Sequence, residues 1–532
     1  MYRNNRNPEV GFLENLLTRE GNDRECAINC FRLFSPSGDA ELCVPRYFGY
    51  NSNVCVCNST YCDSAAVDVP AKGFYRSYES NKDGKRMSQL IGLIENGASD
   101  DNDVNRVILS LNPIKTFQTI HGFGGAFTDS TGINMKALSV GAQAQIIETY
   151  FGVNGSRYSL GRVPAGGTDF STRPYSYDEN AGDDDLEKFE LAFEDFAYKI
   201  PFMQKARELN PDLRFVSAAW SAPAWMKTNH NLTGGLGFLE PAYYEIYANY
   251  LCKFLVEYKK RGLDIWAIST GNEPTDTLVP KLIKFETMGW TPDTMAKWVA
   301  NNLGPTIAGS ESNQTMIFML DDQRFDLPWY VDLVLRHPIA EDYIAAIAIH
   351  WYWDEAFNSS LLDETHSQYP DKPVILTEAC IVFRAAKLLR LGDWTRGEMY
   401  ILDIIDNLRH WVTGWIDWNL ALDKEGGPNW VKNYVDSPVI VNPETDEFFK
   451  QPTYYALAHF SKFVAPGSTR IDITQVDKIR AIAFLTPDNS ENVIVVYNRN
   501  EEPTNVTIFD PEQGNIVLNM SPKSIQTIIY KR

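Results

Sequence analysis

Over residues 114–422, short apolar runs alternate with segments of helical character. This alternation is typical of βα units, in which parallel strands are connected by helices. About eight runs can be counted, a number that fits a closed barrel. The first begin at Phe117, Tyr158 and Phe215, and the last covers residues 412–415. The pattern therefore predicts an α/β fold, a (β/α)₈ TIM barrel, with a doubly wound open sheet as the alternative.

Helix start and stop signals place the limits of several units. Pro241 opens a helix that ends at Gly262, and the strand 263–269 follows directly. Thr291 and Pro292 suit the cap and the first position of another helix. Further elements are predicted at 315–320, 328–336, 344–350 and 373–376. These limits locate the carboxyl ends of the strands, where the active sites of barrel enzymes lie.

The chain changes character after residue 468. Short strand-like runs separated by turns follow one another at 479–484, 492–497, 505–509, 515–518 and 525–530. Such spacing without a helical segment is typical of a β-sandwich. Residues 74–111 also lack helical periodicity. We therefore expect this earlier region to complete the same accessory sandwich.

The charge balance restricts the partners of the chain. It has 69 acidic and 49 basic residues, a net charge of -20 and a pI near 4.9. This charge repels a phosphate backbone, so nucleic acid is not expected as a partner. The longest apolar runs have strand length, far short of the ~20 residues of a membrane-spanning helix. The first thirty residues contain no signal-peptide apolar region, so we expect either a cytosolic protein or a processed mature chain.

The cysteine distribution favours an oxidising compartment. Six of the eight cysteines lie close together, at Cys26, Cys30, Cys43, Cys55, Cys57 and Cys62. A zinc site is the alternative, but there is no CxxC pair and the nearest histidine is His121. Disulfides are therefore preferred. Glycosylation sequons point the same way and occur at Asn58, Asn154, Asn231, Asn313, Asn358, Asn505 and Asn519.

Two glutamates stand at the ends of predicted barrel strands. Glu273 follows the strand 263–269 within the sequence TGNEP, and Glu378 follows the strand 373–376 within LTEA. Both should point into the same end of the barrel. Hydrolysis of a glycosidic bond needs one carboxylic acid to protonate the leaving oxygen and one carboxylate to attack or to activate water. The pair thus predicts a glycoside hydrolase.

Aromatic and amide side chains near the same strand ends support a sugar site. Sugar rings pack their C–H faces on aromatic rings, and their hydroxyl groups require carboxylate or amide partners. The aromatic candidates are Trp220, Trp225, Trp351, Tyr352 and Trp418, and the polar candidates are Asp169, Asn272, Asn419 and Asn433. Trp415 lies inside an apolar run and is expected to be a core residue.

Other chemistries are not supported by motifs. HExxH, Walker A and GxSxG patterns are missing, and the seven histidines show no metal-ligand spacing. We therefore expect no metal ion and no organic cofactor. The glycine cluster at residues 122–125 is interpreted as a tight turn, and Cys380 as a buried free thiol.

Several longer strings resemble one family of enzymes. They are VCVCNSTYCD at 54–63, GFGGAFTD at 122–129, RVP at 162–164, SAPAWMKTN at 221–229, NEP at 272–274, LDDQR at 320–324 and the segment 417–438. Together they resemble the animal lysosomal acid β-glucosylceramidases of glycoside hydrolase family 30, a retaining class. The likeness extends from about Cys43 to the C-terminus.

The resemblance implies roles for individual residues. Glu378 would be the nucleophile that forms a covalent glucosyl-enzyme, and Glu273 the acid/base. The glucose would be held by Asp169, Trp220, Asn272, Trp418 and Asn433, with Trp351 and Tyr352 bordering the pocket. Disulfides Cys43–Cys55 and Cys57–Cys62 are implied as well, whereas Cys26 and Cys30 lie outside the clearest match and are expected to pair with each other.

The resemblance also implies three domains. A small disulfide-stapled sheet would combine residues 1–66 with about 420–451. The sandwich would combine 69–117 with 468–532, and the barrel would cover 118–419, completed by about 452–467. Two departures are clear: Thr168 stands where mammalian members have cysteine, and the stretch 275–288 after the acid/base differs in sequence and length.

The expected activity is hydrolysis of glucosylceramide to glucose and ceramide at acid pH, by double displacement. The implied partners are the glucosylceramide substrate, an anionic membrane surface and a saposin-type activator, and the implied location is the lumenal face of the lysosomal membrane or the secreted fraction. A family-related β-glycosidase acting on soluble glucosides or polysaccharide is the first alternative. A catalytically silent carbohydrate-binding protein is the second.

Overall fold

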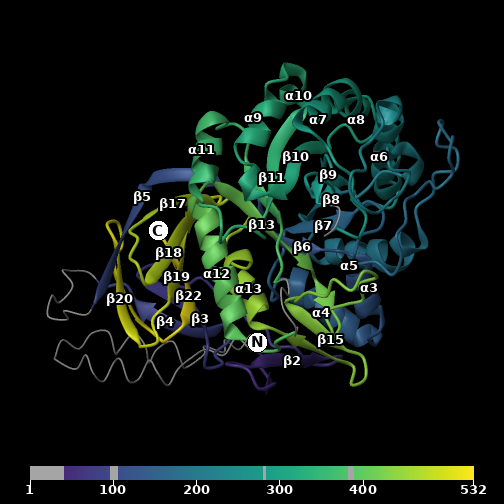
Figure 1. Cartoon of the computed structure of the whole chain (residues 1–532). Coiled ribbons are helices and arrows are strands. Elements are labelled where there is room, and N and C mark those ends of the chain that lie inside the picture. Colours follow the sequence, from purple (N-terminus) through teal and green to yellow (C-terminus); the bar gives the residue numbers. More distant parts are fainter. Residues whose placement is uncertain (1–40, 96–105, 280–282, 382–388) are drawn as a thin grey trace, which may run out of the picture. The chain divides into compact units, whose positions relative to one another are not determined.

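The computed structural model describes residues 41–95, 106–279, 283–381 and 389–532 (Figure 1). Residues 41–532 belong to one compact unit. Cys26 and Cys30, for which a disulfide is expected, lie outside the described residues. Within the described part of the chain, no helix is long and apolar enough to cross a membrane.

Eight parallel strands close into a barrel, in the order β10-β11-β12-β13-β6-β7-β8-β9. They are β6 (Gly122–Ala126), β7 (Leu160–Pro164), β8 (Arg214–Ala218), β9 (Ile265–Ser269), β10 (Met316–Gln323), β11 (Ile344–His350), β12 (Val374–Glu378) and β13 (Val412–Asn419). Apolar side chains from seven of these strands, including Leu160, Val216, Phe318, Ile375 and Ile416, fill the interior. The closed barrel is confirmed, and the open sheet is excluded.

Helices connect the strands and cover the outside of the barrel (Figure 1). They are α3 (Asp129–Lys136), α4 (Val140–Phe151), α5 (Ile200–Leu209), α6 (Tyr244–Lys259), α7 (Pro292–Trp298), α8 (Gly304–Ala308), α9 (Trp329–Leu335), α10 (Pro338–Tyr343), α11 (Ser360–Gln368) and α12 (Trp394–Arg409). Thr291 caps α7 through the backbone N–H of Thr294, and Pro292 occupies the first helical position, as the sequence predicts.

The first barrel strand differs from the prediction. Phe117 belongs to a strand outside the barrel, and the glycine cluster interpreted as a turn forms the buried strand β6. The glycines are needed because neighbouring backbone comes very close: a Cβ atom on Gly124 would lie 1.8 Å from the carbonyl oxygen of Leu160. A strand of small residues lacks the alternation of bulky side chains by which strands are recognised.

A nine-stranded sheet of order β21-β20-β5-β17-β18-β19-β22-β3-β4 forms the accessory sandwich. Its strands are β3 (Phe74–Asn81), β4 (Ser88–Leu93), β5 (Val107–Thr119), β17 (Thr469–Ile473), β18 (Ile479–Leu485), β19 (Glu491–Asn498), β20 (Thr504–Asp510), β21 (Gly514–Met520) and β22 (Ser524–Lys531). The long strand β5 pairs with β20 through its first residues and with β17 through its later ones. It thereby joins the two layers around a separate apolar core.

A five-stranded sheet lies at the end of the unit near β2 and β15 in Figure 1. It contains β1 (Pro45–Arg46), β2 (Val54–Asn58), β14 (Ala421–Leu422), β15 (Val439–Asn442) and β16 (Glu447–Lys450). Disulfides link Cys43 to Cys55 and Cys57 to Cys62, in the implied pairing. The strands thus bring the two distant parts of the chain, near residues 54 and 440, into one sheet.

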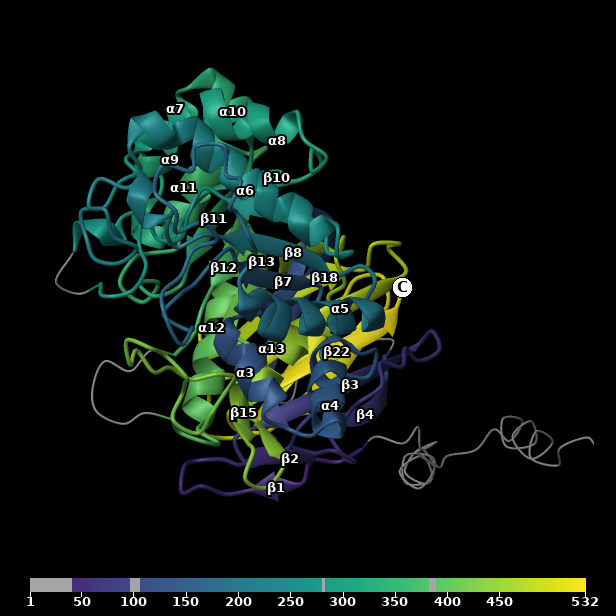
Figure 2. The ribbon, with the colours of Figure 1, turned by 90° about the vertical axis from the view of Figure 1, so that its right-hand side faces the viewer.

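Helix α13 (Pro452–Ser461) connects the barrel to the sandwich, and both Figure 1 and Figure 2 show it among these elements. The ring of Phe460 packs on Phe123 of β6 with a centroid distance of 6.2 Å. On the sandwich side, the two ring nitrogens of the buried His459 are hydrogen bonded to Thr527 of β22 and Ser80 of β3. The barrel is therefore fixed on the sandwich through buried contacts of α13.

Candidate active site

A cavity of about 730 Å³ opens at the carboxyl ends of the barrel strands. Eight residues singled out from the sequence line it together: Asp169, Trp220, Asn272, Glu273, Tyr352, Glu378, Trp418 and Asn433. They come from β12, β13 and the loops after β7, β8, β9, β11 and β14. The fold therefore brings residues that are up to 264 positions apart in sequence to one site.

The two glutamates face each other across this cavity. Glu273 follows β9 with a φ of 43°, and Glu378 is the last residue of β12. One carboxylate oxygen of Glu273, one of Glu378 and a ring nitrogen of His350 all lie within 4.8 Å of one another. The pair is therefore close enough to act on the same bond from its two sides.

Both oxygens of Glu378 accept hydrogen bonds from strong donors. Arg162, the central residue of β7, contacts Oε2 through Nη1, and the Tyr352 hydroxyl donates to Oε1 at 2.6 Å. The Arg162 guanidinium is fully buried and lies over the rings of Trp220 and Trp418, 5.0 and 5.4 Å from their centroids. Because arginine does not lose its proton in proteins, this arrangement favours the carboxylate form of Glu378.

Glu273 has a different set of partners. Its Oε1 accepts a hydrogen bond from Gln323 Nε2 at 2.7 Å and is 2.9 Å from His350 Nδ1. The other ring nitrogen of His350 is 3.2 Å from Asp321 Oδ1. Burial lowers the pKa of His350, but the surrounding carboxylates of Glu378, Asp321 and Glu273 outweigh burial and raise it to about 10. His350 is therefore an imidazolium that donates to both acidic neighbours.

The two glutamates compete for one proton. Burial raises the pKa of Glu378, and the charge of Glu273 adds to the rise although Arg162 and His350 oppose it. Burial also raises the pKa of Glu273, but the hydrogen bond and charge of His350 reverse the direction, so its pKa is lowered. Because the charge of Glu273 is one cause of the rise at Glu378, protonation of Glu273 lowers the pKa of Glu378.

Hydrogen-bonded polar side chains also line the cavity. Asp169 Oδ2 accepts hydrogen bonds from Asn429 Nδ2 at 3.1 Å and from Asn433 Nδ2 at 3.0 Å. Burial raises the pKa of Asp169 to about 7, against the opposing hydrogen bonds of the two amides. Asn272 is held through its Oδ1, which accepts a hydrogen bond from Arg162 Nη2 at 2.8 Å.

Two tryptophans form an aromatic wall. The rings of Trp220 and Trp418 stack with a centroid distance of 5.2 Å and an angle of 22°. The edge of Phe170 packs on Trp418 at 6.1 Å. Stacking fixes the orientation of both indoles, so their positions do not depend on a bound ligand.

Other predicted aromatic and amide residues lie outside the cavity lining. Trp351 donates its indole N–H to the carbonyl of Cys380 and packs on Tyr400. Trp225 donates to the carbonyl of Asp178 instead. Asn419 accepts a hydrogen bond from Thr128 in the barrel interior. Trp415 is fully buried, as expected for a core residue.

The sequence analysis assigned no role to Arg162, His350, Asp321 and Gln323, which contact the two glutamates directly or through His350. Arg162 lies inside the buried strand β7, and Asp321 inside β10, where charged groups are rare. The signal available in the sequence was a charged residue within an apolar strand. The partners of Arg162 and Asp321 lie on other strands, however, so spacing along the chain could not identify these partners.

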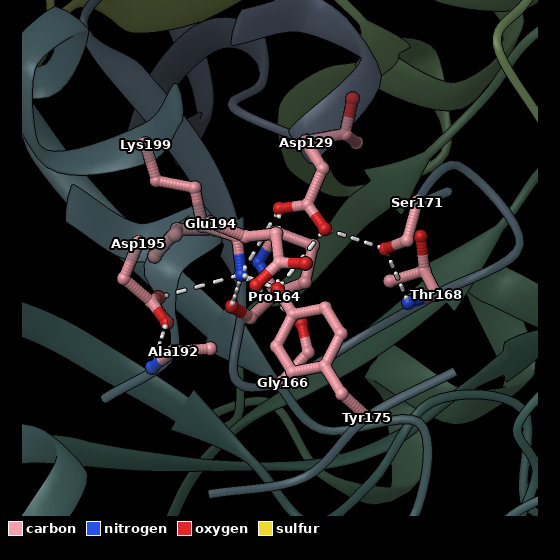
Figure 3. A network of polar contacts seen from close by, with 12 residues as sticks. Asp129, Pro164, Gly166, Thr168, Ser171, Tyr175, Ala192, Glu194, Asp195 and Lys199 are labelled. Atoms are coloured by element: carbon pink, nitrogen blue, oxygen red, sulfur yellow. Dashed lines mark hydrogen bonds and ion pairs between the residues drawn. The ribbon is translucent and has the colours of Figure 1, made fainter. Parts of the chain in front are cut away.

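A buried lysine supports the loop that presents Asp169 (Figure 3). Lys199 Nζ donates to the carbonyls of Pro164 and Gly166 at 3.1 and 3.0 Å, and it pairs with Asp129 and Asp195 at 3.5 and 3.4 Å. Asp129 in turn accepts a hydrogen bond from Ser171. Figure 3 shows these groups converging on the Lys199 amino group, and the loop between β7 and α5 is thereby held at both of its ends.

Two groups of potential metal ligands occur among the described residues. Cys57, Cys62 and Asp63 form one, but the two cysteines are joined in a disulfide and offer no thiolates. Glu273, His350 and Glu378 form the other. Their ligand atoms are already bonded to one another or to Arg162, Tyr352 and Gln323. The second group is therefore better suited to acid–base chemistry than to metal binding.

Replacing Tyr352 with Phe removes one of the two donors to Glu378. Because a hydrogen bond to the charged form lowers a pKa, its loss raises the pKa of Glu378, and the acidic limb of the kcat/KM–pH profile should move to higher pH. We also expect kcat/KM for an aryl β-glucoside to fall by about 10- to 100-fold.

Tyr369→Phe is the matched control, because the Tyr369 hydroxyl donates to Asp332 away from the cavity. Both variants are compared with the unchanged enzyme in pH-dependent steady-state kinetics. An acidic limb that stays in place after Tyr352→Phe would contradict the assigned contact.

Comparisons with known proteins agree with the barrel and the sandwich of the structure. The family model described as the glycosyl hydrolase family 30 TIM-barrel domain matches residues 120–464, and the family 30 β-sandwich domain matches residues 467–528. The chain is 40% identical to lysosomal acid glucosylceramidase of Mus musculus, over 94% of this chain and 98% of that protein.

Two further similarities are more distant. Endo-1,6-β-D-glucanase of Neurospora crassa is 27% identical over 81% of this chain and 90% of its own length. The crystal structure of SrfJ from Salmonella typhimurium superposes with a TM-score of 0.79 at 26% identity, covering 86% of this chain and all of that one.

Proposed function

The chain belongs to glycosyl hydrolase family 30, and on this premise we propose that it is a retaining β-glucosidase that hydrolyses glucosylceramide at acid pH. The observation that carries the proposal is the pair Glu273 and Glu378, with carboxylate oxygens within 4.8 Å of each other. Carboxyl groups of retaining glycosidases are about 5–5.5 Å apart, whereas inverting enzymes need roughly 6.5–9.5 Å to accommodate a water molecule.

In the first step, a carboxylate oxygen of Glu378 attacks the anomeric carbon of glucose. Glu273 donates its proton to the glycosidic oxygen, the bond from that oxygen to the anomeric carbon breaks, and the aglycone leaves with a free hydroxyl group. Arg162 and Tyr352 oppose the rise that burial causes in the pKa of Glu378, and they thereby favour the ionised form that attacks. The product is an α-linked glucosyl ester of Glu378.

In the second step, Glu273 acts as a base. It removes a proton from water while the water oxygen attacks the anomeric carbon, and the ester bond to Glu378 breaks. Glucose leaves with the β configuration, and Glu273 is protonated for the next cycle. Activity should therefore be bell-shaped with an acidic optimum, because it needs a protonated Glu273 and an ionised Glu378 at the same time.

Glucose would bind where polar and aromatic groups meet. Asp169 and Asn433 would hold hydroxyl groups on one side, and Trp220 and Trp418 would cover one edge of the ring. Asn272 has its carbonyl oxygen fixed by Arg162, so its amide nitrogen remains to donate to a ligand, in our proposal the 2-hydroxyl of glucose.

The apolar part of the cavity lining supports a lipid aglycone. It is contributed by Val279, Ile283, Phe285, Phe325, Trp353, Val431 and Val435. Such a lining suits the hydrocarbon portion of ceramide better than the hydroxyl groups of a glucan chain. The named activity of the Mus musculus relative supports the same substrate.

The cellular setting is also part of the proposal. The two disulfides favour an oxidising compartment, and the relative's name points to the lysosome. We propose action at an anionic membrane surface with a saposin-type activator, on the lumenal side or after secretion. Glycosylation is proposed at the sequons with exposed asparagines, which are Asn154, Asn231, Asn313, Asn358, Asn505 and Asn519, and at the half-buried Asn58.

The glucanase relative gives a second candidate function, hydrolysis of a soluble β-1,6-glucan by the same two glutamates. A single experiment separates the candidates. Product release at about pH 5 is measured from glucosylceramide in mixed anionic-lipid micelles, from an aryl β-glucoside and from β-1,6-glucan. The proposal predicts glucose from the first two. Release from the glucan alone would support the second candidate, and no release from any substrate would support a silent binding protein.

A further inference from the structure

We propose that Asp276 is a positioning residue for the acid/base, because its carboxyl group retains a proton and donates a hydrogen bond to the carboxylate of Glu273. The inference rests on the proposed function, in which Glu273 protonates the leaving group. Its consequence is that Glu273 loses its proton at a lower pH, so that hydrolysis is confined to acidic surroundings.

The backbone places the two carboxyl groups together. The N–H of Asp276 donates to the carbonyl of Glu273 at 3.0 Å, which closes a turn directly after the NEP sequence. Glu273 has a positive φ of 43° at the start of this turn. Both side chains line the same cavity, and their carboxyl groups are hydrogen bonded to each other.

A hydrogen bond between two carboxyl groups requires a proton on one of them, because an ionised carboxylate has only acceptors. Glu273 already receives donors from Gln323 and His350 on Oε1, which favour its charged form. Among the described residues, Asp276 has no ion pair with a lysine, arginine or histidine. The proton therefore belongs to Asp276.

The remaining charges around the pair agree with this assignment. The titratable groups that act on the pair are Arg162 of β7, Asp322 of β10, His350 of β11 and Glu378 of β12. Arg162 and His350, the cations of this set, already bind carboxylates other than Asp276.

The acidic members of the set oppose ionisation of Asp276. Asp322 is held by the backbone N–H and hydroxyl of Thr275, and its charge, present above its own raised pKa of about 6, opposes ionisation of Asp276. Lys284 lines the same cavity but is exposed. Burial and the charges of Glu273 and Asp322 raise the pKa of Asp276 to about 10, so it stays neutral throughout the acidic range.

The direction in which Asp276 shifts the pKa of Glu273 follows from its role as a hydrogen-bond donor. A neutral Asp276 stabilises the charged form of Glu273 and lowers the pKa of Glu273. In the productive state Glu378 is already ionised, and the basic limb of the kcat/KM profile then reports loss of the proton from Glu273, so this contact holds that limb at low pH. An ionised Asp276 would instead raise the pKa of Glu273 by charge repulsion.

The test compares Asp276→Ala and Asp276→Asn with the unchanged chain, using kcat/KM for 4-methylumbelliferyl β-glucoside from about pH 4 to 8. The alanine variant should move the basic limb upward by about half a unit to one unit, which is about three- to tenfold more activity on that limb. The asparagine variant retains a donor and should keep the limb near its original position. If the alanine variant does not fold, Asp276→Val replaces it: valine is close to aspartate in volume, and the same upward movement of the basic limb is expected.

Three results would overturn the inference: a limb that does not move in the alanine or valine variant, a limb that moves downward, or an asparagine variant that behaves like alanine. A purely structural role would lower activity at every pH without moving the limb. With 2,4-dinitrophenyl β-glucoside, whose leaving group needs no proton, the variants should no longer differ in this limb. Failure of the proposed function is distinct, since the unchanged chain would then hydrolyse neither glucoside.

Discussion

Glu378→Gln is expected to reduce kcat/KM for glucosylceramide and for an aryl β-glucoside by at least about 10⁴-fold. The amide has nearly the same shape as the carboxylate but cannot form the glycosyl ester. It also places a neutral group beside Arg162, whose Nη1 contacts Oε2 of Glu378. The loss should be the same for good and poor leaving groups, because attack by Glu378 is needed for both.

The matched control is Glu364→Gln, a change of the same type at an exposed glutamate of α11. Its rates should equal those of the unchanged enzyme. Purified proteins are compared by far-ultraviolet circular dichroism and then by glucose release at about pH 5. A Glu378→Gln variant that is folded and loses less than about tenfold in rate would remove Glu378 from the role of nucleophile.

Lys199→Met is expected to lower the free energy of unfolding by about 3–5 kcal/mol, because it leaves Asp129 and Asp195 buried without their cation. The Lys199 side chain is fully buried, so water cannot replace the lost donor. The carbonyls of Pro164 and Gly166 lose a hydrogen bond at the same time. The loop bearing Asp169 should loosen, and KM for the glucoside should rise.

Lys205→Met in α5, which begins directly after Lys199, is the control, since Lys205 is exposed and forms no ion pair among the described residues. Urea unfolding followed by tryptophan fluorescence gives both free energies. The double variant Lys199→Met with Asp129→Asn should recover part of the loss, because it removes one of the two unpaired charges. Equal stability of the Lys199 and Lys205 variants would contradict the structural role shown in Figure 3.

The sequence predicted the barrel and the placement of two glutamates at one end of it, because both depend on short-range patterns. The apolar runs at 263–269 and 373–376 have strand length and are followed by polar residues, so the positions of Glu273 and Glu378 followed from local spacing. The first strand was misplaced for a local reason too. Its glycines lack bulky side chains, and the neighbouring run at Phe117 gave the stronger signal although it belongs to the sandwich.

Contacts between strands could not be predicted in the same way. Arg162 meets Glu378 across 216 positions of the chain, and no spacing rule connects them. Trp351 and Tyr352 are adjacent in sequence, yet the tyrosine reaches Glu378 and the tryptophan packs on Tyr400 behind the cavity. The direction of a side chain after a strand end is set by the loop that follows. The conformation of that loop depends on tertiary contacts, which the local sequence does not specify.

The central claim, that Glu378 is the nucleophile of a retaining glucosidase, is tested most directly by trapping the covalent intermediate. The enzyme is incubated with 2-deoxy-2-fluoro-β-glucosyl fluoride, whose leaving group needs no acid and whose 2-fluorine slows release of the ester. Proteolysis and mass spectrometry then locate the added sugar. We predict one 2-deoxy-2-fluoroglucosyl group on the peptide that contains Glu378, and none in Glu378→Gln. An unlabelled enzyme, or a label on the peptide that contains Glu273, would contradict the account.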